Sequence, residues 1–423
     1  MKIWMDKIIK SPKGTKDCLP WETYIWKYIE NFLRNKARIY GIKEIRTPIF
    51  EYTDLFLRGV GDTTDIVQKE MYTFNDKGNR SITLKAEGTA PTIRSFIEHG
   101  MYSNPQPTKL FYITPVFRYE NVQKGRLRQH HQFGVEIFGT DSPISDAEII
   151  SMAYSIYDDL NLKNIKVYIN SLGCDECRSI YNQKFKKFLE GISENLCSIC
   201  QERLKKNPLR ILDCKNEECK NMLLEDAPSI LDYICQTCTK HFNDVQLYLN
   251  MFNVDFEVKS SIVRGLDYYT RTVFEIVDES NTTLCGGGRY NNLIEELGGK
   301  DCPAVGFGMG IERLLLSLGD NLYRYVKDDR IDLFVINHSE EYKTDALKIC
   351  NKLRKFNIKC DTDCLNRSFK QQMKYANKIN AKNIVVIGRD ELYTGMIKIK
   401  NMDTSEVTIL NLNNDKEIQK YFL

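Results

Sequence analysis

The chain has 423 residues, of which 42% are hydrophobic and 28% are charged, and its formal net charge at pH 7 is +3. This composition is typical of a globular protein, and the length predicts two or three domains that each bury a core. No apolar run approaches the roughly 20 residues that span a bilayer, which argues against a membrane protein. The basic N-terminus lacks the apolar core of a signal peptide, so we expect a cytoplasmic protein. Because the net charge is small, binding to nucleic acid would need local basic patches.

Apolar residues at helical spacing predict a helix over 21–40, which stops at Gly41. The next stretch, "IKEIRTPIFE", predicts a strand that is interrupted at Pro48, and a charged loop follows through "RGVGDTTD". Two short strands are then predicted in "KEMYTF" and "SITLKAEG". These elements precede the segments that carry the chemistry.

Two longer strands, 110–120 and 131–139, flank a basic loop. Alternate residues of a strand share a face, so Arg118 lies with Glu120, and Gln132 lies with Glu136. The apolar residues between the latter two point the other way, into a core. A polar face on otherwise apolar strands indicates a sheet that carries a site.

Further along, "AVGFGMGIERLLLSLG" predicts a glycine-rich strand that leads into a helix, and the charged run "YRYVKDDRID" marks a domain boundary. We therefore expect a first domain over 1–325 and a second over 331–423. Strands and helices alternate in the second domain, which predicts a small α/β fold.

Three arginines are candidates for binding phosphate: Arg118, Arg264 and Arg313. A guanidinium group is permanently charged and binds phosphate through two parallel hydrogen bonds. For any single arginine, an ion pair with a nearby carboxylate is the more ordinary interpretation, but the three together favour a polyphosphate site. The chain contains neither a P-loop sequence nor a dinucleotide fingerprint, so the common nucleotide-binding folds are not indicated.

Two further groups of basic residues admit both a structural and a functional interpretation. Lys124, Arg126 and Arg128 lie in the loop between the long strands and form either a solvated turn or contacts to phosphate. In the second domain, lysines recur at every fourth position and form one stripe on a helix. A solvated face explains this stripe, and a nucleic-acid surface is the alternative; the lysines are Lys370, Lys374, Lys378 and Lys382.

Cysteine is unusually concentrated: eight of the 14 cysteines fall between Cys174 and Cys238. We interpret the region of about 174–243 as an inserted module, with thiols or metal ligands rather than disulfides. Neighbouring pairs are 19 and 15 residues apart, which resembles the spacing of four-thiolate zinc sites. The spacing predicts one site from Cys174, Cys177, Cys197 and Cys200 and a second from Cys214, Cys219, Cys235 and Cys238. A single site built from distant pairs, or buried cysteines without a metal, are the alternatives.

Several of these segments together resemble a known family. "TPIFE", "FRYE" and "GFGMGIERL" look like motifs 1, 2 and 3 of class II aminoacyl-tRNA synthetases. "LKAEGTA", "QKGRLRQHHQFGVEIFG", "RGLDYYTRTVFE" and "CGGGRY" resemble the histidyl-tRNA synthetase family, and the likeness covers nearly the whole chain. It implies an α+β fold, with an antiparallel-sheet catalytic domain, a helical Cys-rich insertion and a C-terminal α/β anticodon-binding domain. It also implies a homodimer with motif 1 at the interface, and the charging of tRNA(His) with L-histidine by ATP and Mg²⁺.

The resemblance also implies roles for single residues. Arg118 and Arg313 would bind the phosphates of ATP, with Glu120 and Arg126 in the same site, and Arg264 would contact both the α-phosphate and the histidine carboxylate. Histidine would be bound by Glu87, Thr89, Gln132, Glu136, Tyr268 and Tyr269. Lys124, Arg128 and the lysine stripe are the candidates for contact with tRNA. Whether Asp267 orients Arg264 or caps the turn is left open.

Three departures from the family pattern stand out. Lys85 and Ala86 replace the usual residues before Glu87, and His130 stands where an aromatic residue usually stacks on adenine. The cysteine pairs are not general to the family, so the resemblance gives the zinc sites no support.

Two other functions compete with the synthetase. One is an inactive paralogue that acts as the regulatory subunit of ATP phosphoribosyltransferase, and the other is a zinc-knuckle protein that binds nucleic acid without catalysis. The first would be expected to lose "RGLDYY", and the second leaves the arginines without a purpose.

Overall fold

The computed structural model describes residues 8–61, 64–214, 216–326 and 329–422. The chain divides into two compact units, Met1–Val326 and Lys327–Leu423, and each is described by itself. Among the described residues, no helix is long and apolar enough to cross a membrane.

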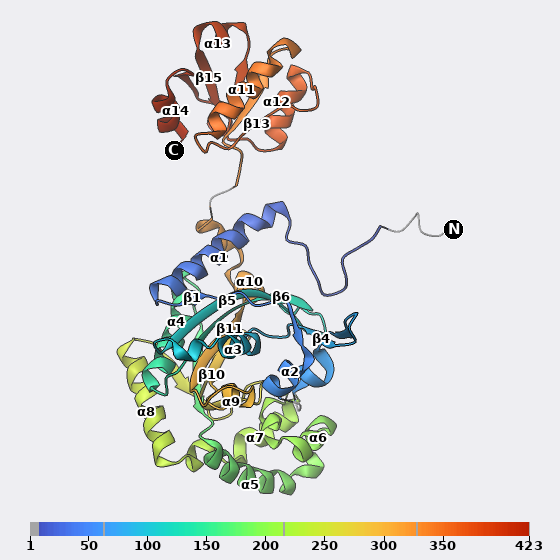
Figure 1. Cartoon of the computed structure of the whole chain (residues 1–423), viewed down its shortest axis with the longest axis vertical. Coiled ribbons are helices and arrows are strands. Elements are labelled where there is room, and N and C mark those ends of the chain that lie inside the picture. Colours follow the sequence, from blue (N-terminus) through green and yellow to red (C-terminus); the bar gives the residue numbers. More distant parts are fainter. Residues whose placement is uncertain (1–7, 62–63, 215, 327–328, 423) are drawn as a thin grey trace, which may run out of the picture. The chain divides into compact units, whose positions relative to one another are not determined.

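The first unit is built on one eight-stranded sheet with the order β1-β5-β6-β11-β10-β9-β7-β8 (Figure 1). Neighbouring strands from β5 to β7 are antiparallel, and only the edge pairs β1/β5 and β7/β8 are parallel. The strands are β1 (Lys43–Glu44), β5 (Thr108–Phe117), β6 (Gln129–Phe138), β7 (Lys166–Ser171), β8 (Phe256–Val258), β9 (Thr270–Val277), β10 (Thr283–Arg289) and β11 (Ala304–Gly310). This is the antiparallel sheet that the sequence predicts.

Helices cover one face of this sheet and form the main hydrophobic core with it. They are α1 (Pro20–Ile39), α4 (Pro143–Asp159), α8 (Gln236–Met251) and α10 (Ile311–Leu318). Phe133, Val135 and Ile137 of β6 point into this core, as the alternation along the strand predicts. Their neighbours on the strand therefore face the opposite side of the sheet, where the helices leave a cleft.

Smaller elements border the cleft on that opposite side. A three-stranded sheet with the order β2-β4-β3 lies beside helices α2 and α3. The elements are β2 (Phe50–Tyr52), α2 (Thr53–Val60), η1 (Ile66–Glu70), β3 (Thr73–Asn75), β4 (Ser81–Leu84), α3 (Thr89–Glu98), η2 (Met101–Ser103) and α9 (Leu293–Glu296). The prediction of a loop through "RGVGDTTD" is wrong at its start, because Phe56 and Val60 are buried and hold 53–60 as a helix. Asp62 and Thr63 of that loop lie outside the described residues.

One buried ion pair ties the sheet to helix α4. Arg289, at the end of β10, has 0% exposure, and its Nη2 lies 2.5 Å from Asp146 Oδ2 of α4. Arg289 also donates to the carbonyl groups of Thr140 and Ser142, which precede the helix. Burial alone would raise the pKa of Asp146, but Arg289 and His241 lower it to about 2. Asp146 is therefore ionised at neutral pH, and the pair fixes the helix against the sheet.

The cysteine-rich insertion is helical and lies between β7 and α8 (Figure 1, green). It contains α5 (Asp175–Gly191), η3 (Ser193–Asn195), α6 (Ser198–Lys206), η4 (Pro208–Asp213), α7 (Glu217–Asp226) and η5 (Ile230–Tyr233). Its apolar residues pack with Tyr268 and Tyr269 in a second hydrophobic cluster, so the insertion shares a core with the eight-stranded sheet.

The second unit is a five-stranded mixed sheet with the order β13-β12-β14-β15-β16. Its elements are η7 (Glu340–Tyr342), α11 (Lys343–Arg354), α12 (Phe369–Lys378), α13 (Arg389–Thr394), α14 (Asp415–Phe422), β12 (Leu333–Asn337), β13 (Cys360–Thr362), β14 (Asn383–Ile387), β15 (Met396–Asn401) and β16 (Val407–Asn411); η6 (Gly319–Arg324) ends the first unit. Lys370, Lys374 and Lys378 are exposed on α12, whereas Lys382 lies beyond the helix and pairs with Asp332 at 2.8 Å. The stripe therefore has three members on the helix.

Candidate active site

A cleft of about 210 Å³ lies on the side of the sheet away from the main core. Its walls come from β6, β10 and β11, together with the loop after β5, the starts of α3 and α10, and the loop before β9. All the residues predicted to bind histidine or ATP line it: Glu87, Thr89, Arg118, Glu120, Arg126, Gln132, Glu136, Arg264, Tyr268, Tyr269 and Arg313. Segments far apart in the sequence thus meet in one site.

The floor of the cleft is made of glycines because charged side chains lie directly on the sheet. A Cβ atom at Gly306 would overlap the carboxylate of Glu136, and one at Gly308 would overlap the amide of Gln132. A Cβ atom at Gly286 of β10 would overlap the guanidinium group of Arg264. The glycines of "GFGMG" and "CGGGRY" therefore leave the space that these polar side chains occupy.

Glu136 is the centre of a buried network of hydroxyl groups. It has 1% exposure, and it accepts hydrogen bonds from Thr89 Oγ1 at 2.8 Å, Tyr112 Oη at 3.1 Å and Tyr290 Oη. Burial raises the pKa of Glu136 to about 8, against the lowering effect of these hydrogen bonds. Tyr112 and Tyr290 were missed from the sequence, although "CGGGRY" contains the second of them.

Glu87 caps the first turn of α3. Its two carboxylate oxygens accept hydrogen bonds from the backbone N–H groups of Thr89 at 2.7 Å and Ala90 at 2.6 Å. Burial nevertheless raises its pKa. Gln132 Oε1 accepts from the backbone N–H of Gly88 at 3.0 Å, which fixes the same turn to β6. These contacts hold a polar wall beside Glu136.

The segment Arg264–Tyr269, which we call the histidine loop, forms another wall. Tyr268 and Tyr269 are buried with their ring centroids 4.7 Å apart, and the centroid of Tyr290 lies 5.5 Å from that of Tyr268. Arg264 forms an ion pair with Glu275 of β9. The Asp267 side chain accepts a hydrogen bond from Asn207 and forms an ion pair with Arg210, both residues of the insertion.

The other end of the cleft is rich in arginine. Arg118 Nε donates to the carbonyl oxygen of Ala86 at 2.8 Å, and Arg313 donates to those of Gly125 at 3.1 Å and Thr283 at 2.6 Å. Arg126 pairs with Glu120 at 3.4 Å. Burial and the neighbouring Arg126 lower the pKa of Arg313, although it stays charged at neutral pH. Backbone carbonyls thus orient several arginines whose positive charges repel one another. A bound anion would reduce this repulsion.

His130 lies in the same cleft, on the face of β6 that carries Gln132 and Glu136. Burial, followed by repulsion from Arg118 and Arg313, lowers its pKa to about 3. The imidazole is therefore neutral at pH 7 and presents an uncharged aromatic ring among the arginines.

The predicted tRNA-binding residues lie outside this cleft. The guanidinium group of Arg128 lies 3.6 Å from the centroid of the Tyr119 ring, and Lys124 borders a separate cavity beside α1 and α10. Lys370, Lys374 and Lys378 belong to the second unit.

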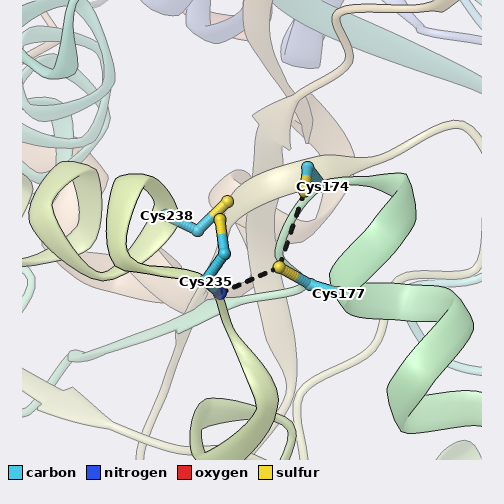
Figure 2. Close-up of side chains that lie close together, drawn as sticks. All are labelled: Cys174, Cys177, Cys235 and Cys238. Carbon is cyan, nitrogen blue, oxygen red and sulfur yellow. Dashed lines mark hydrogen bonds between the residues drawn. The ribbon is translucent and has the colours of Figure 1, made fainter.

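The eight cysteines of the insertion gather into two clusters that can each hold a metal ion. The outer cluster joins Cys174 and Cys177 to Cys235 and Cys238 (Figure 2). The inner cluster contains Cys197, Cys200, Cys214 and Cys219. The predicted grouping of sequence neighbours is thus wrong: the first pair joins the fourth, and the second joins the third. The helices decide this partition, because α5 begins at the place where α8 begins.

The pKa of Glu136 gives a prediction about the folded state. A carboxyl group whose folded pKa is raised favours the folded state at low pH, and this contribution is lost between its unfolded pKa, about 4.5, and about 8. We expect the free energy of unfolding of wild type, relative to Glu136→Gln, to fall between pH 5 and pH 8. Urea denaturation followed by tryptophan fluorescence measures this, since Trp21 and Trp26 lie in the first unit. If the difference in free energy of unfolding between wild type and Glu136→Gln is the same at pH 5 and pH 8, the raised pKa is contradicted.

Comparison with known proteins agrees with this geometry. A family model described as histidyl-tRNA synthetase matches residues 14–176 and 186–314, and an anticodon binding domain model matches 332–418. The chain is 51% identical over 414 residues to the histidine–tRNA ligase of Clostridium botulinum (strain Kyoto / Type A2), covering 98% of this chain and 99% of that protein. It is 54% identical over 416 residues to the ligase of Caldanaerobacter subterraneus subsp. tengcongensis, with the same coverage.

A solved structure shows the same fold. The apo histidyl-tRNA synthetase of S. aureus superposes with a TM-score of 0.81 at 41% identity, over 98% of this chain and 100% of that chain. The chain belongs to the histidyl-tRNA synthetase family.

Proposed function

We propose that the chain activates L-histidine with ATP to give histidyl-adenylate and pyrophosphate, and then transfers the histidyl group to the 3′ end of tRNA(His). The observation that carries this proposal is a single cleft that joins a buried carboxylate and phenol pocket to a cluster of arginines. The named activity of relatives that are 51% and 54% identical supports the same reaction. No observation favours the regulatory-subunit or zinc-knuckle alternatives.

The pocket around Glu136 suits an imidazole side chain. Histidine offers ring nitrogens to Glu136 and Tyr269, while Tyr268 covers the ring. Glu87, Thr89 and Gln132 lie beside Glu136 and are assigned to the α-amino group. Selection follows because a side chain without ring nitrogens would leave these buried polar groups unpaired.

The arginine end of the cleft suits ATP. Attack of the histidine carboxylate on the α-phosphorus brings two anions together, so cations fixed in advance lower the barrier. We assign Arg118 and Arg264 to the α-phosphate, Arg313 to the γ-phosphate, and Glu120 and Arg126 to the nucleotide. The neutral ring of His130 is placed to contact the adenine. Glu120, a carboxylate beside these cations, suits Mg²⁺ bound with the phosphates, where the ion would neutralise charge on them.

The tRNA is assigned to basic residues outside the cleft. Lys124 and Arg128 lie in the loop between β5 and β6. The exposed lysines of α12 lie in the unit that matches an anticodon binding domain. We therefore propose catalytic residues within 1–325 and anticodon contacts within 331–423. A cytoplasmic location follows from this role, because tRNA charging serves protein synthesis.

We also propose a homodimer. The motif 1 segment exposes a patch of large apolar side chains around the small sheet: Ile49, Phe50, Tyr52 and Phe74 are 47–57% exposed. An exposed apolar patch of this kind is typical of an interface, and a self-complementary patch gives a closed dimer.

Structural Zn²⁺ is the metal that we propose for both cysteine clusters. All four Sγ atoms of each cluster lie within 4.8 Å of one another, and tetrahedral Zn–S bonds of about 2.3 Å place the sulfurs about 3.8 Å apart. Backbone N–H groups also point at the sulfurs, from Cys235 to Cys177 Sγ at 3.0 Å and from Cys197 to Cys219 Sγ at 3.1 Å. Four thiolates leave no open position, so the role of the metal is structural.

The reaction is tested by histidine-dependent exchange of pyrophosphate into ATP. Wild type is expected to catalyse it, and Arg264→Ala to slow it by about 10²–10³-fold, as does loss of a donor to transition-state charge in other enzymes. The affinity for tRNA should change less than about twofold, since phosphate contacts elsewhere dominate it. Arg38→Ala, exposed on α1, is the control and should behave as wild type. Absence of exchange in folded wild type, or equal loss of both properties in the variant, would contradict the assignment.

The dimer is tested by light scattering of the purified full chain. Tyr52→Asp places a charge in the motif 1 patch and is expected to give a monomer or a dimer at least tenfold weaker. Tyr393→Asp makes the same change at a residue of the second unit that is 91% exposed, and it should leave the mass unchanged. A monomeric wild type rules out the dimer.

The metal is tested by elemental analysis after dialysis. Wild type is expected to hold two Zn²⁺ per chain, whereas Cys174→Ser and Cys197→Ser should each hold one. Cys18→Ser changes an exposed cysteine outside both clusters and should keep two. Folded, active wild type without zinc would show that the clusters are free thiols.

A further inference from the structure

Asp267 is one contact between the histidine loop and the insertion. The carbonyl oxygen of Tyr269 is another, since it accepts a hydrogen bond from Arg178 Nη1 of α5 at 3.0 Å. Asn207 Nδ2 donates to Asp267 Oδ1 at 3.1 Å, and Arg210 Nε lies 3.3 Å from the same oxygen. Arg210 is only 7% exposed, and its Nε makes no hydrogen bond with good geometry, so the contact to Asp267 is a close ion pair. Burial of the Arg210 guanidinium group costs little free energy only while it stays paired with the Asp267 carboxylate.

Asp267 is confined on its other side as well. A Cβ atom at Gly61, which ends α2 with φ +94°, would lie 3.0 Å from Asp267 Oδ2. A Cβ atom at Gly265 would lie 4.0 Å from Arg210 Nη1. The carboxylate is thus held between the end of α2 and the insertion. Arg264 lies three residues before Asp267 in the chain, and Tyr268 and Tyr269 follow it directly.

The inner cluster brings together the two ends of the segment that contacts Asp267. Asn207 and Arg210 lie between two of its ligands, Cys200 and Cys214; Asn207 is the C-cap of α6, and Arg210 lies on η4. Ile211, next to Arg210, is fully buried, and Arg203 Nη1 donates to the carbonyl oxygen of Arg210 at 2.9 Å. A metal at this cluster therefore fixes both ends of a short segment whose middle reaches the active site.

The cysteines of the inner cluster lie close to the ends of helices. Cys197 is the N-cap of α6, and Cys200 and Cys219 lie in the first turns of α6 and α7. Two helix N-termini thus meet at this cluster. Cys197 Sγ and Cys214 Sγ lie 3.8 Å apart, the separation of two thiolates on one tetrahedral ion.

We infer that the inner cluster, with its metal bound, holds Arg210 and Asn207 against Asp267 and so positions the histidine loop for catalysis. Arg210 is a positioning residue, because it acts on Asp267 and does not line the cleft. This inference rests on the proposed function. Its consequence is that a structural metal controls the histidine pocket, since displacements of about 1 Å in a catalytic group cost about 10²-fold in rate.

The first experiment separates positioning from general stability by pyrophosphate exchange. Arg210→Met removes the ion pair while keeping an apolar side chain, and it is expected to raise the KM for histidine at least tenfold with the KM for ATP within twofold. Lys205→Met removes a cation from an exposed position of the same segment and is expected to match wild type. In an Asp267→Asn background, Arg210→Met should raise the KM for histidine less than twofold further. An unchanged histidine KM in folded Arg210→Met, or an equal effect in both backgrounds, overturns the inference.

The second experiment does not depend on activity. Amide hydrogen exchange of residues 264–270 is measured in the full chain without substrates, alongside the zinc content. Arg210→Met is expected to keep two zinc ions yet exchange at least tenfold faster over 264–270, and Cys219→Ser should lose one zinc ion and show the same increase. Lys205→Met should show neither change. Unchanged exchange in Arg210→Met overturns the inference, whereas wild type without histidine-dependent exchange of pyrophosphate overturns the proposed function and leaves this measurement intact.

Discussion

The close packing of charged side chains onto the sheet is the constraint on which the rest of the active site depends. Glu136, Gln132 and Arg264 lie where side chains of β10 and β11 would otherwise be, and only glycine at 286, 306 and 308 leaves that space. The strands keep their ladder because their backbone hydrogen bonds do not need side chains, and the opposite face supplies the apolar contacts that stabilise the sheet. The cleft is therefore a product of missing Cβ atoms on one face and a full core on the other.

Charge is separated along this cleft. At one end burial raises the pKa of Glu136 to about 8 among phenols, and at the other end burial, followed by repulsion from the arginines, lowers the pKa of His130 and keeps it neutral. An aromatic ring with hydrogen-bonding nitrogens fits the first environment, and a polyphosphate fits the second. In the proposed reaction, the carboxylate of the amino acid would meet the α-phosphate where the two ends join.

The insertion uses another means of stability. Short helices of 9 or 10 residues, such as α6 and α7, are marginal by themselves, and two metal sites would link their ends directly. The outer cluster closes the insertion where the chain leaves β7 and returns through α8, and the inner one fixes the segment that touches Asp267. A metal bound at the inner cluster would therefore also restrain the histidine loop.

The sequence by itself determined the local features: the helix, predicted over 21–40 and found over 20–39, the two long strands, the shared face of Gln132 and Glu136, and the thiol pairs. Each depends on residues a few positions apart, so backbone periodicity is sufficient. Only the tertiary structure decided how the thiol pairs combine, that Tyr112 and Tyr290 complete the network of Glu136, and that Asp267 meets Arg210 rather than a neighbour in the chain. Those contacts join residues separated by tens or hundreds of positions, and which of them meet depends on where helix ends and strands come together, a property that no local pattern encodes.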